Sequence, residues 1–207
     1  MKITEMFLTP NKYSRPGIKL EKVEKIAVHY VGNPKSTAKN NRDYFENLKD
    51  THARYVSAHF IIGLDGEIIQ CIPLNEWSYC TNQANGYSIS IECCHPDATG
   101  KFNKTTEDSL VELCAYLCEK FGLTADDVIR HYDVTGKHCP LWYVSHPEDY
   151  GAFKARVKSA LSGAAEKPAE DSKMYYVQVG AFSSKANAEK YLEKVKKDYP
   201  GAFIKTM

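Results

Sequence analysis

The most informative stretch of the sequence reads Arg130-His131-Tyr132-Asp133-Val134-Thr135-Gly136-Lys137-His138-Cys139-Pro140. His131 and Cys139 are residue types that bind soft or borderline metal ions such as Zn²⁺. Gly136 and the polar residues around it allow the backbone to fold back, so that both side chains can face one point. The stretch therefore predicts a zinc site built on a loop.

A third ligand is expected from the apolar segment Ile26-Ala27-Val28-His29-Tyr30-Val31. Its β-branched and aromatic residues predict an inner strand, which would hold the His29 imidazole in a fixed direction. Three protein ligands leave the fourth tetrahedral position of Zn²⁺ open for water, whereas structural sites usually fill all four. His29, His131 and Cys139 thus favour a catalytic site, although a His and a Cys at this spacing also occur by chance.

Hydrolysis at such a site also needs a group that moves protons and a positive group near the developing oxyanion. Glu92, near the end of a predicted strand, is the candidate for the first role, and Lys137 for the second; both could equally be ordinary surface charges. His59 lies in another predicted strand and either orients a ligand, contacts substrate or is a plain core residue. The other histidines are expected to be structural or solvated: His52, His95, His138 and His146.

The composition is that of a soluble globular protein, with 43% hydrophobic and 26% charged residues among 207. This length favours one domain of roughly 150 residues and a small appendage. A net charge of +1 gives no electrostatic case for nucleic acid or an anionic membrane surface. The segment from Met1 to Pro10 lacks a sustained apolar core and contains Glu5, so we expect no signal peptide, no membrane insertion and a cytoplasmic location before release.

Seven cysteines are present, an odd number without the regular spacing of a disulfide framework. The cysteines other than Cys139 are Cys71, Cys80, Cys93, Cys94, Cys114 and Cys118. Most of them are expected to be buried small hydrophobic residues, in a reducing compartment or an anaerobic host.

Secondary structure follows from the apolar pattern. Strands are predicted over residues 25–31, 56–62, 67–72, 87–93 and 128–130. Asp65-Gly66 between the second and third of these predicts a hairpin, and the mixed polarity of residues 73–86 predicts a loop. Helices are predicted over about 36–49, from Thr105 or Thr106 to Phe121, and over about 148–161.

The C-terminal part of the chain has a separate organisation. After a first domain of residues 1–161, residues 162–172 contain no large apolar side chain and predict a linker. Residues 173–207 predict a small β-α-β module, with a strand over 174–180, a helix over 185–197 and a second strand starting at 202. Because so short a segment rarely folds alone, dimerisation or docking is expected.

Four segments of the chain, in order, resemble motifs of the type 2 zinc-dependent N-acetylmuramoyl-L-alanine amidases, which are related to phage lysozyme-like amidases and peptidoglycan recognition proteins. The segments are Ala27-Val28-His29, Val56-Ser57-Ala58-His59-Phe60-Ile61-Ile62 with Asp65-Gly66-Glu67-Ile68, Tyr87-Ser88-Ile89-Ser90-Ile91-Glu92, and His131 to Pro140. The resemblance covers about residues 20–160. It implies a mixed α/β fold, with a central mixed β-sheet flanked by helices, and zinc bound by His29, His131 and Cys139 in a groove that accepts a glycan bearing a stem peptide.

The resemblance also implies roles for other residues. Glu92 matches the Glu that some relatives use as proton shuttle, and Lys137 matches a Lys two residues before the third ligand. Ala58 stands where other relatives have a Tyr. Trp77 matches a loop that contacts substrate or supports the site, but Ser78-Tyr79-Cys80 follow it where many members have His-Ala-Gly.

Residues 175–189 resemble the first half of a sporulation-related repeat, a module that binds the glycan strands of peptidoglycan. A full module has two such halves and only one is present here. Either two chains complete the module as a homodimer, or the tail is a truncated wall-binding element.

Together these features predict a peptidoglycan hydrolase that cleaves the amide between N-acetylmuramic acid and L-alanine, with Zn²⁺ as cofactor. The expected absence of a signal peptide beside a wall-directed tail fits an endolysin of a phage or prophage. One alternative is an intracellular amidase that recycles muropeptides. Another is a recognition protein that binds peptidoglycan without cutting it; such relatives typically lose the Cys ligand, and Cys139 is present.

Overall fold

The computed structural model describes residues 1–163, 180–199 and 202–204. The chain separates into two compact units, Met1–Glu166 and Lys167–Met207.

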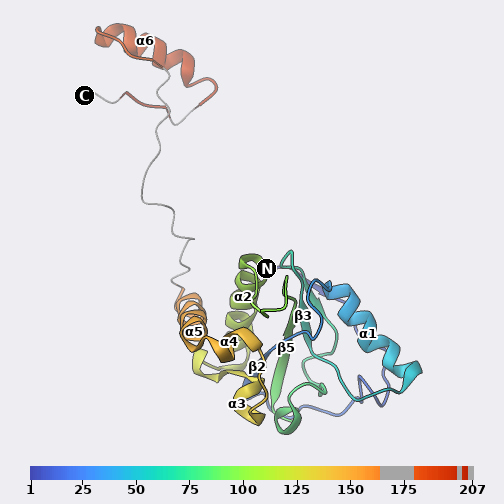
Figure 1. Ribbon diagram of the computed structural model, residues 1–207. Coiled ribbons are helices and arrows are strands. Elements are labelled where there is room, and N and C mark those ends of the chain that lie inside the picture. The colour runs from blue at the N-terminus through green and yellow to red at the C-terminus, as the bar shows by residue number, and fades with distance from the viewer. Residues whose placement is uncertain (164–179, 200–201, 205–207) are drawn as a thin grey trace. The chain divides into compact units, whose positions relative to one another are not determined.

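The first unit is built on a six-stranded sheet in the order β1-β4-β3-β5-β2-β6 (Figure 1). The strands are β1 (Ile3–Glu5), β2 (Lys25–Tyr30), β3 (Phe60–Ile62), β4 (Ile68–Gln70), β5 (Ser88–Cys93) and β6 (Val128–Arg130). Neighbouring strands are parallel except β3 and β4, which are antiparallel. The predicted mixed sheet flanked by helices is confirmed.

Helices connect these strands and follow the last of them. They are α1 (Ala38–Thr51), α2 (Lys104–Phe121), α3 (His131–Thr135), α4 (Leu141–Ser145) and α5 (Pro147–Leu161), with short 3-10 turns at η1 (Asn82–Ala84) and η2 (Ala125–Asp127). The side chain of Thr37 caps α1 and that of Asn103 caps α2, so both helices begin one or two residues away from the predicted starts. Gly122 ends α2 in the left-handed conformation, with φ of 66°, as its position in the sequence suggested.

The two faces of the sheet are covered unequally. On one face, α2 and α5 bury apolar side chains of the inner strands, including Val28, Ile91 and Phe60. On the other face α1 packs against β3 and β4, where Ile61 and Phe45 belong to a second, smaller cluster. The part of this face over β5, β2 and β6 is therefore covered by loops, η1 and α3 instead of a long helix (Figure 1).

Strand register brings two of the predicted site residues together on this loop-covered face. His29 of β2 lies directly beside Glu92 of the parallel strand β5. Their sequence neighbours Val28 and Ile91 point into the α2 side, and side chains alternate along a strand. His29 and Glu92 therefore project from the opposite face, near the carboxyl ends of their strands.

The hairpin predicted around Asp65-Gly66 is confirmed, since Phe60 to Ile62 pair with Gln70 to Ile68. β3 is shorter than predicted and starts at Phe60. The backbone of the preceding residues bonds elsewhere: Val56 N–H donates to the Tyr13 carbonyl at 3.2 Å, and Ser57 N–H to the Tyr79 carbonyl at 3.1 Å. These hydrogen bonds attach residues 56 and 57 to the segments around Tyr13 and Tyr79 instead of to a neighbouring strand.

The second unit contains the helix α6 (Lys185–Val195), which confirms the helix predicted over residues 185–197. The rings of Phe182 and Tyr191 lie 5.3 Å apart within this unit. Residues 174–179 of the predicted strand and residues 164–172 of the predicted linker lie outside the described residues. The expected second strand is not present over residues 202–204. In the described parts of the chain, no helix has the length and apolarity needed to cross a bilayer.

Candidate active site

His29 is held in a fixed orientation inside the first unit. It lies near the carboxyl end of β2, the strand between β5 and the edge strand β6, and is only 1% exposed. Its Nε2 is 3.0 Å from the Thr81 hydroxyl oxygen, and its Nδ1 is 3.6 Å from the Cys139 sulfur. If Nε2–H donates to Thr81, Nδ1 carries a lone pair directed at Cys139, which is the arrangement that a metal-binding imidazole requires.

His131 and Cys139 reach the same point from the loop that follows β6. His131 is the first residue of α3, and the Asp133 carboxylate accepts a hydrogen bond of 2.8 Å from the Arg130 backbone N–H at the start of this helix. Gly136 ends the helix with φ of 74°, and Tyr132 N–H then donates to the Cys139 carbonyl at 3.0 Å. The tight loop places the two side chains beside each other, as the sequence predicted.

The donor atoms of His29, His131 and Cys139 all lie within 4.8 Å of one another. Two ligands of a tetrahedral zinc ion are about 3.5 Å apart, given Zn–N and Zn–S bond lengths of about 2.0 and 2.3 Å. Within the described residues, neither ring nitrogen of His131 has a hydrogen-bond partner, although both are buried. Because buried polar atoms are rarely left unpaired, the orphaned imidazole and the nitrogen-nitrogen-sulfur donor set fit a zinc ion.

Burial tunes the protonation of the three side chains. It lowers the pKa of His131 to about 4, with the positive charge of Lys137 acting in the same direction. Burial, together with His131 and Lys137, also holds the pKa of His29 well below its ordinary value. Both imidazoles are therefore neutral, the form that binds metals. Burial and the Glu92 carboxylate raise the pKa of Cys139 to about 12, so that metal binding must displace the thiol proton.

Glu92 lies beside this group, and one of its two carboxyl oxygens has no hydrogen-bond partner in the part of the chain that the structure describes. The Cys80 thiol donates to Oε1 at 3.6 Å, whereas Oε2 is buried without a partner among the described residues. Burial raises the pKa of Glu92 to about 8, although the Cys80 hydrogen bond and the charge of Lys137 oppose this shift. A carboxyl group with a pKa near neutral can both accept and return a proton, as general acid–base catalysis requires.

Lys137 lies on the exposed side of the same loop, where its carbonyl accepts the Cys139 N–H at 2.7 Å. Its ammonium charge lowers the pKa of His29, His131 and Glu92. It is the one group of the predicted set that solvent reaches freely. This position suits a residue that meets negative charge on a bound molecule.

His59 and Trp77 lie outside the ligand group. His59 is fully buried: Ser90 N–H donates to its Nδ1 at 3.0 Å, and its Nε2 lies 2.8 Å from the Glu76 carbonyl. Both nitrogens are thus used to tie the loop after β4 to β5. Trp77 packs against the larger apolar cluster and lies over Gly86, where an added Cβ would come within 2.8 Å of the indole ring.

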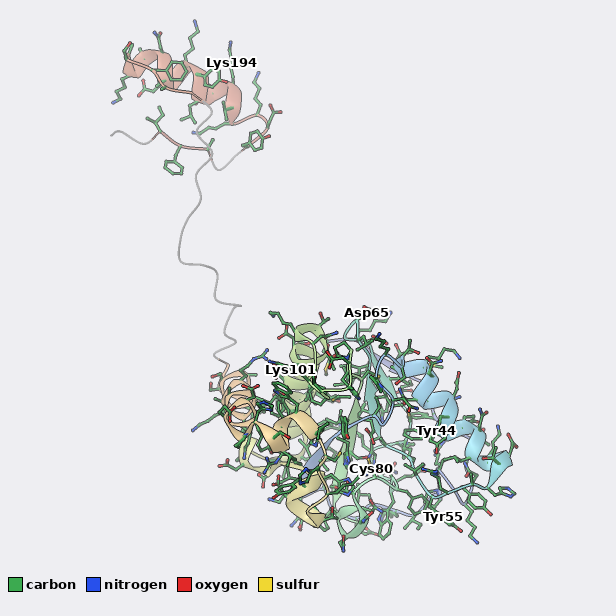
Figure 2. All side chains as sticks on the ribbon, in the orientation of Figure 1. Tyr44, Tyr55, Asp65, Cys80, Lys101 and Lys194 are labelled. Carbon is green, nitrogen blue, oxygen red and sulfur yellow. The ribbon has the colours of Figure 1, made fainter. Side chains whose placement is uncertain are left out.

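Two further residues, Cys80 and Thr81, belong to the site and were not assigned to it from the sequence. The Asn85 side chain accepts hydrogen bonds from the backbone N–H groups of both, at 3.1 Å and 2.7 Å, and so fixes the loop. In Figure 2 the labels of Cys80 and of the hairpin residue Asp65 lie well apart. The donor atoms of Cys80, His29 and Glu92 also lie within 4.8 Å of one another. The departure at residues 78–80 from the family pattern was the only signal for Cys80, and Thr81 had none.

Family profiles match two parts of the chain. The profile of the N-acetylmuramoyl-L-alanine amidases matches residues 19–142, and that of the SPOR domain matches residues 148–206. The SPOR match begins within α5, whose residues Phe153 and Val157 belong to the core of the first unit. The SPOR match therefore covers the end of the first unit, and from Lys167 onward it covers the second unit.

Curated relatives include the N-acetylmuramoyl-L-alanine amidase BlyA of Bacillus subtilis (strain 168), 37% identical over 191 residues, which are 82% of this chain and 50% of BlyA. Another is the N-acetylmuramoyl-L-alanine amidase CwlL of Bacillus licheniformis, 35% identical over 174 residues, 78% of this chain and 48% of CwlL. The chain thus spans about half the length of these relatives. Among solved structures, that of PlyL is 27% identical with a TM-score of 0.67, covering 77% of this chain and 98% of PlyL.

Proposed function

Because the chain belongs to the N-acetylmuramoyl-L-alanine amidase family, we propose that it hydrolyses the amide bond between N-acetylmuramic acid and the L-alanine of the stem peptide. The observation that carries this proposal is the combination of a three-donor group with a neighbouring buried carboxyl. Such a group leaves one position of a tetrahedral ion open, as in zinc hydrolases.

We assign His29, His131 and Cys139 as zinc ligands. Zinc held by these residues supplies a Lewis acid for the amide carbonyl and lowers the pKa of bound water. Thr81 holds the His29 ring by its Nε2, and Asp133 holds the start of α3 from which His131 projects. The same support fixes the direction of both imidazoles, so that little rearrangement accompanies metal binding.

Glu92 is assigned as the residue that moves the proton. Its unpartnered Oε2 accepts the proton of the attacking water and passes it to the nitrogen of the departing L-alanine. The raised pKa of Glu92 makes the protonated form stable enough to act as the acid in the second step. The Cys80 thiol donates its hydrogen bond to Oε1, so Oε2 is the oxygen that takes the proton.

Lys137 is assigned to the negative charge that develops on the carbonyl oxygen. Its charge lowers the pKa of His29, His131 and Glu92, and its exposed position allows it to meet the substrate as the substrate binds. Electrostatic stabilisation of this kind acts on the transition state more than on the ground state.

We further propose that the second unit retains the enzyme on peptidoglycan. The SPOR match over residues 148–206 supports this role, and a homodimer that completes the module remains a prediction. In biological terms we favour an endolysin of a phage or prophage, because a solved structure described as a mutant endolysin from Bacillus subtilis is 27% identical to the chain with a TM-score of 0.64. A recognition protein that does not cut is disfavoured because the metal-binding Cys139 is present.

The test is digestion of purified Gram-positive cell walls by the full chain, with a chelator, and with a chelator followed by zinc. Mass spectrometry of released stem peptides should show free N-terminal L-alanine, lost with the chelator and restored by zinc. Metal content measured on the same samples links the loss to the ion. Walls that stay uncut but bind the protein would mean a binding module, and the roles given to Glu92 and Lys137 would be withdrawn.

A further inference from the structure

Three tyrosines from separate segments form a continuous strip of rings, called here the tyrosine wall: Tyr13, Tyr55 and Tyr79. The Tyr13 and Tyr55 ring centroids are 5.1 Å apart, and those of Tyr55 and Tyr79 are 5.6 Å apart with the rings nearly perpendicular. Tyr55, the central member, is 51% exposed. An aromatic side chain exposed to this extent at the centre of a cluster offers a binding surface more than a core.

Backbone hydrogen bonds hold the wall in place. Val56 N–H donates to the Tyr13 carbonyl at 3.2 Å, and Ser57 N–H donates to the Tyr79 carbonyl at 3.1 Å. In return, Tyr79 N–H donates to the Ser57 hydroxyl at 3.0 Å. These bonds take the place of strand pairing before β3, so the local departure from the sheet is what assembles the three rings. A rigid surface loses little conformational freedom when a ligand binds.

The wall adjoins the active site along the chain. Tyr79 is followed by Cys80, whose sulfur is 3.6 Å from Oε1 of Glu92. Figure 2 shows the labels of Tyr55 and Cys80 both away from Asp65. The wall therefore ends one residue from a side chain that contacts Glu92.

We propose that the tyrosine wall is a saccharide subsite, which binds the N-acetylated sugar rings of the glycan strand next to the N-acetylmuramic acid that is cut. The inference rests on the proposed function, because it takes the glycan as the occupant. A pyranose ring has an apolar face of C–H groups and a polar edge of hydroxyl and acetamido groups. A tyrosine has the matching combination, an apolar ring with a polar tip.

The competing occupant is the stem peptide, which differs from the glycan in charge. The wall itself contains no Lys, Arg, Asp or Glu, although exposed Lys12 and Arg54 precede Tyr13 and Tyr55 in the chain. A peptide carboxylate bound by these cations would be released by salt. Stacking of a neutral sugar on the rings depends little on ionic strength, so salt dependence distinguishes the two.

The experiment is a calorimetric titration of the zinc-loaded full chain with a linear tetramer of N-acetylglucosamine, which has no stem amide to cut. The variants are Tyr55→Ala, Tyr55→Phe and, as a matched control, Tyr44→Ala on α1, which removes a tyrosine that is 44% exposed elsewhere. The second unit is identical in all four proteins, so its own glycan binding cancels in the comparison. Thermal unfolding confirms that each variant is folded.

We expect Tyr55→Ala to weaken binding about tenfold, the upper range for one aromatic contact. Tyr55→Phe should stay near the wild-type affinity because the ring remains, and Tyr44→Ala should match the wild type. The affinity should be the same at low and high salt. Equal affinities for Tyr55→Ala and the wild type would overturn the subsite, and salt-sensitive binding of a stem peptide lost in Tyr55→Ala would assign the wall to the peptide instead.

A kinetic measurement separates this inference from the proposed function. On glycan strands bearing stem peptides, Tyr55→Ala should raise KM about tenfold at unchanged kcat, because the contact is lost equally from the ground and transition states. On a single N-acetylmuramoyl peptide, which is too short to reach the wall, both constants should stay at the wild-type values. Absence of amide cleavage by the wild type would reject the amidase function, while the titration would still decide whether the wall binds sugar.

Discussion

At the scale of single residues, the two nitrogens of His29 have different tasks. Nε2 is tied to the Thr81 hydroxyl and Nδ1 faces Cys139. A hydrogen bond of this kind fixes both the tautomer and the ring orientation of a metal ligand, and its loss typically lowers metal affinity by about 10- to 100-fold. We therefore assign Thr81 as a positioning residue, which acts through the proposed ligand His29.

Replacing Thr81 by Val should raise the zinc dissociation constant within that range, because the Nε2–H group is left unpaired in a fully buried place. Competition with a chromophoric chelator measures the constant. Thr81→Ser keeps the hydroxyl and should restore most of the affinity. Unchanged zinc affinity in Thr81→Val would mean that the hydrogen bond is incidental.

Glu92→Gln should retain zinc and lose turnover by about 10²- to 10⁴-fold, the usual contribution of a general acid–base group. The amide keeps the shape of the carboxyl and can still accept from Cys80, but it cannot take a proton from water. Metal content and kcat are measured on the same preparation, with Glu119→Gln on the exposed face of α2 as the control. Near-normal turnover in Glu92→Gln would reject the assigned role.

The residue pattern predicted the grouping of His29, His131 and Cys139 better than it predicted the residues around that group. His131 and Cys139 are close in sequence on a turn, and His29 lies in an apolar strand, so residue type and local pattern were sufficient to single them out. Thr81 and Cys80 act through a loop whose path depends on the Asn85 side chain. Hydrophobic periodicity does not reveal a contact of this kind, so the places of these two residues in the site could not be predicted from the sequence.

At the scale of secondary structure, α1 is fastened to the N-terminal segment by one carboxylate. Glu46 accepts hydrogen bonds from Thr9 N–H at 3.0 Å, from the Thr9 hydroxyl at 2.6 Å and from Lys49 at 2.6 Å. Burial opposes its ionisation, but these hydrogen bonds and the charge of Arg42 outweigh burial and lower the pKa of Glu46 from 4.5 to about 2. The ionised form is thus favoured by folding.

A carboxyl whose pKa is lower in the folded state stabilises the protein above its unfolded-state pKa, and this contribution disappears as the pH falls toward the folded-state value. The contribution of Glu46 should therefore be complete above about pH 5 and lost between pH 4.5 and 2. Since the network reaches solvent, which screens it, we expect about 1–2 kcal/mol. Glu46→Gln should lower the free energy of urea unfolding by this amount at pH 7 and by much less at pH 3. An equal effect at both pH values would contradict the assignment.

The predicted elements were most accurate where the apolar pattern was long. The inner strands β2 and β5 and the helices α2 and α5 have many buried positions, and the sequence placed all four to within a few residues. β1 has three residues, one of them half-buried, and pairs only with β4, so its existence depends on a distant partner. The short helices α3 and α4 likewise have too few turns for a helical period to be visible.

At the scale of the whole molecule, every residue assigned to catalysis lies in Met1–Glu166, together with both apolar clusters. A chain that ends at residue 163 should therefore keep the wild-type kcat/KM on a soluble N-acetylmuramoyl peptide. It should bind cell walls more weakly, because the remainder of the SPOR match is removed. Steady-state kinetics and co-sedimentation with walls measure the two properties. Loss of activity in the shortened, folded chain would assign part of the site to the second unit.

The unequal covering of the sheet has a consequence for how such enzymes diversify. Strand register sets the separation of His29 and Glu92, and the loop after β6 supplies Lys137 together with the other two proposed ligands. The segments that carry Tyr13 and Tyr55 supply no residue assigned to zinc binding or proton transfer. Exchange of these two segments between relatives that attack different cell walls would therefore change the target and leave the cutting chemistry intact, which makes them a natural site for engineering host range.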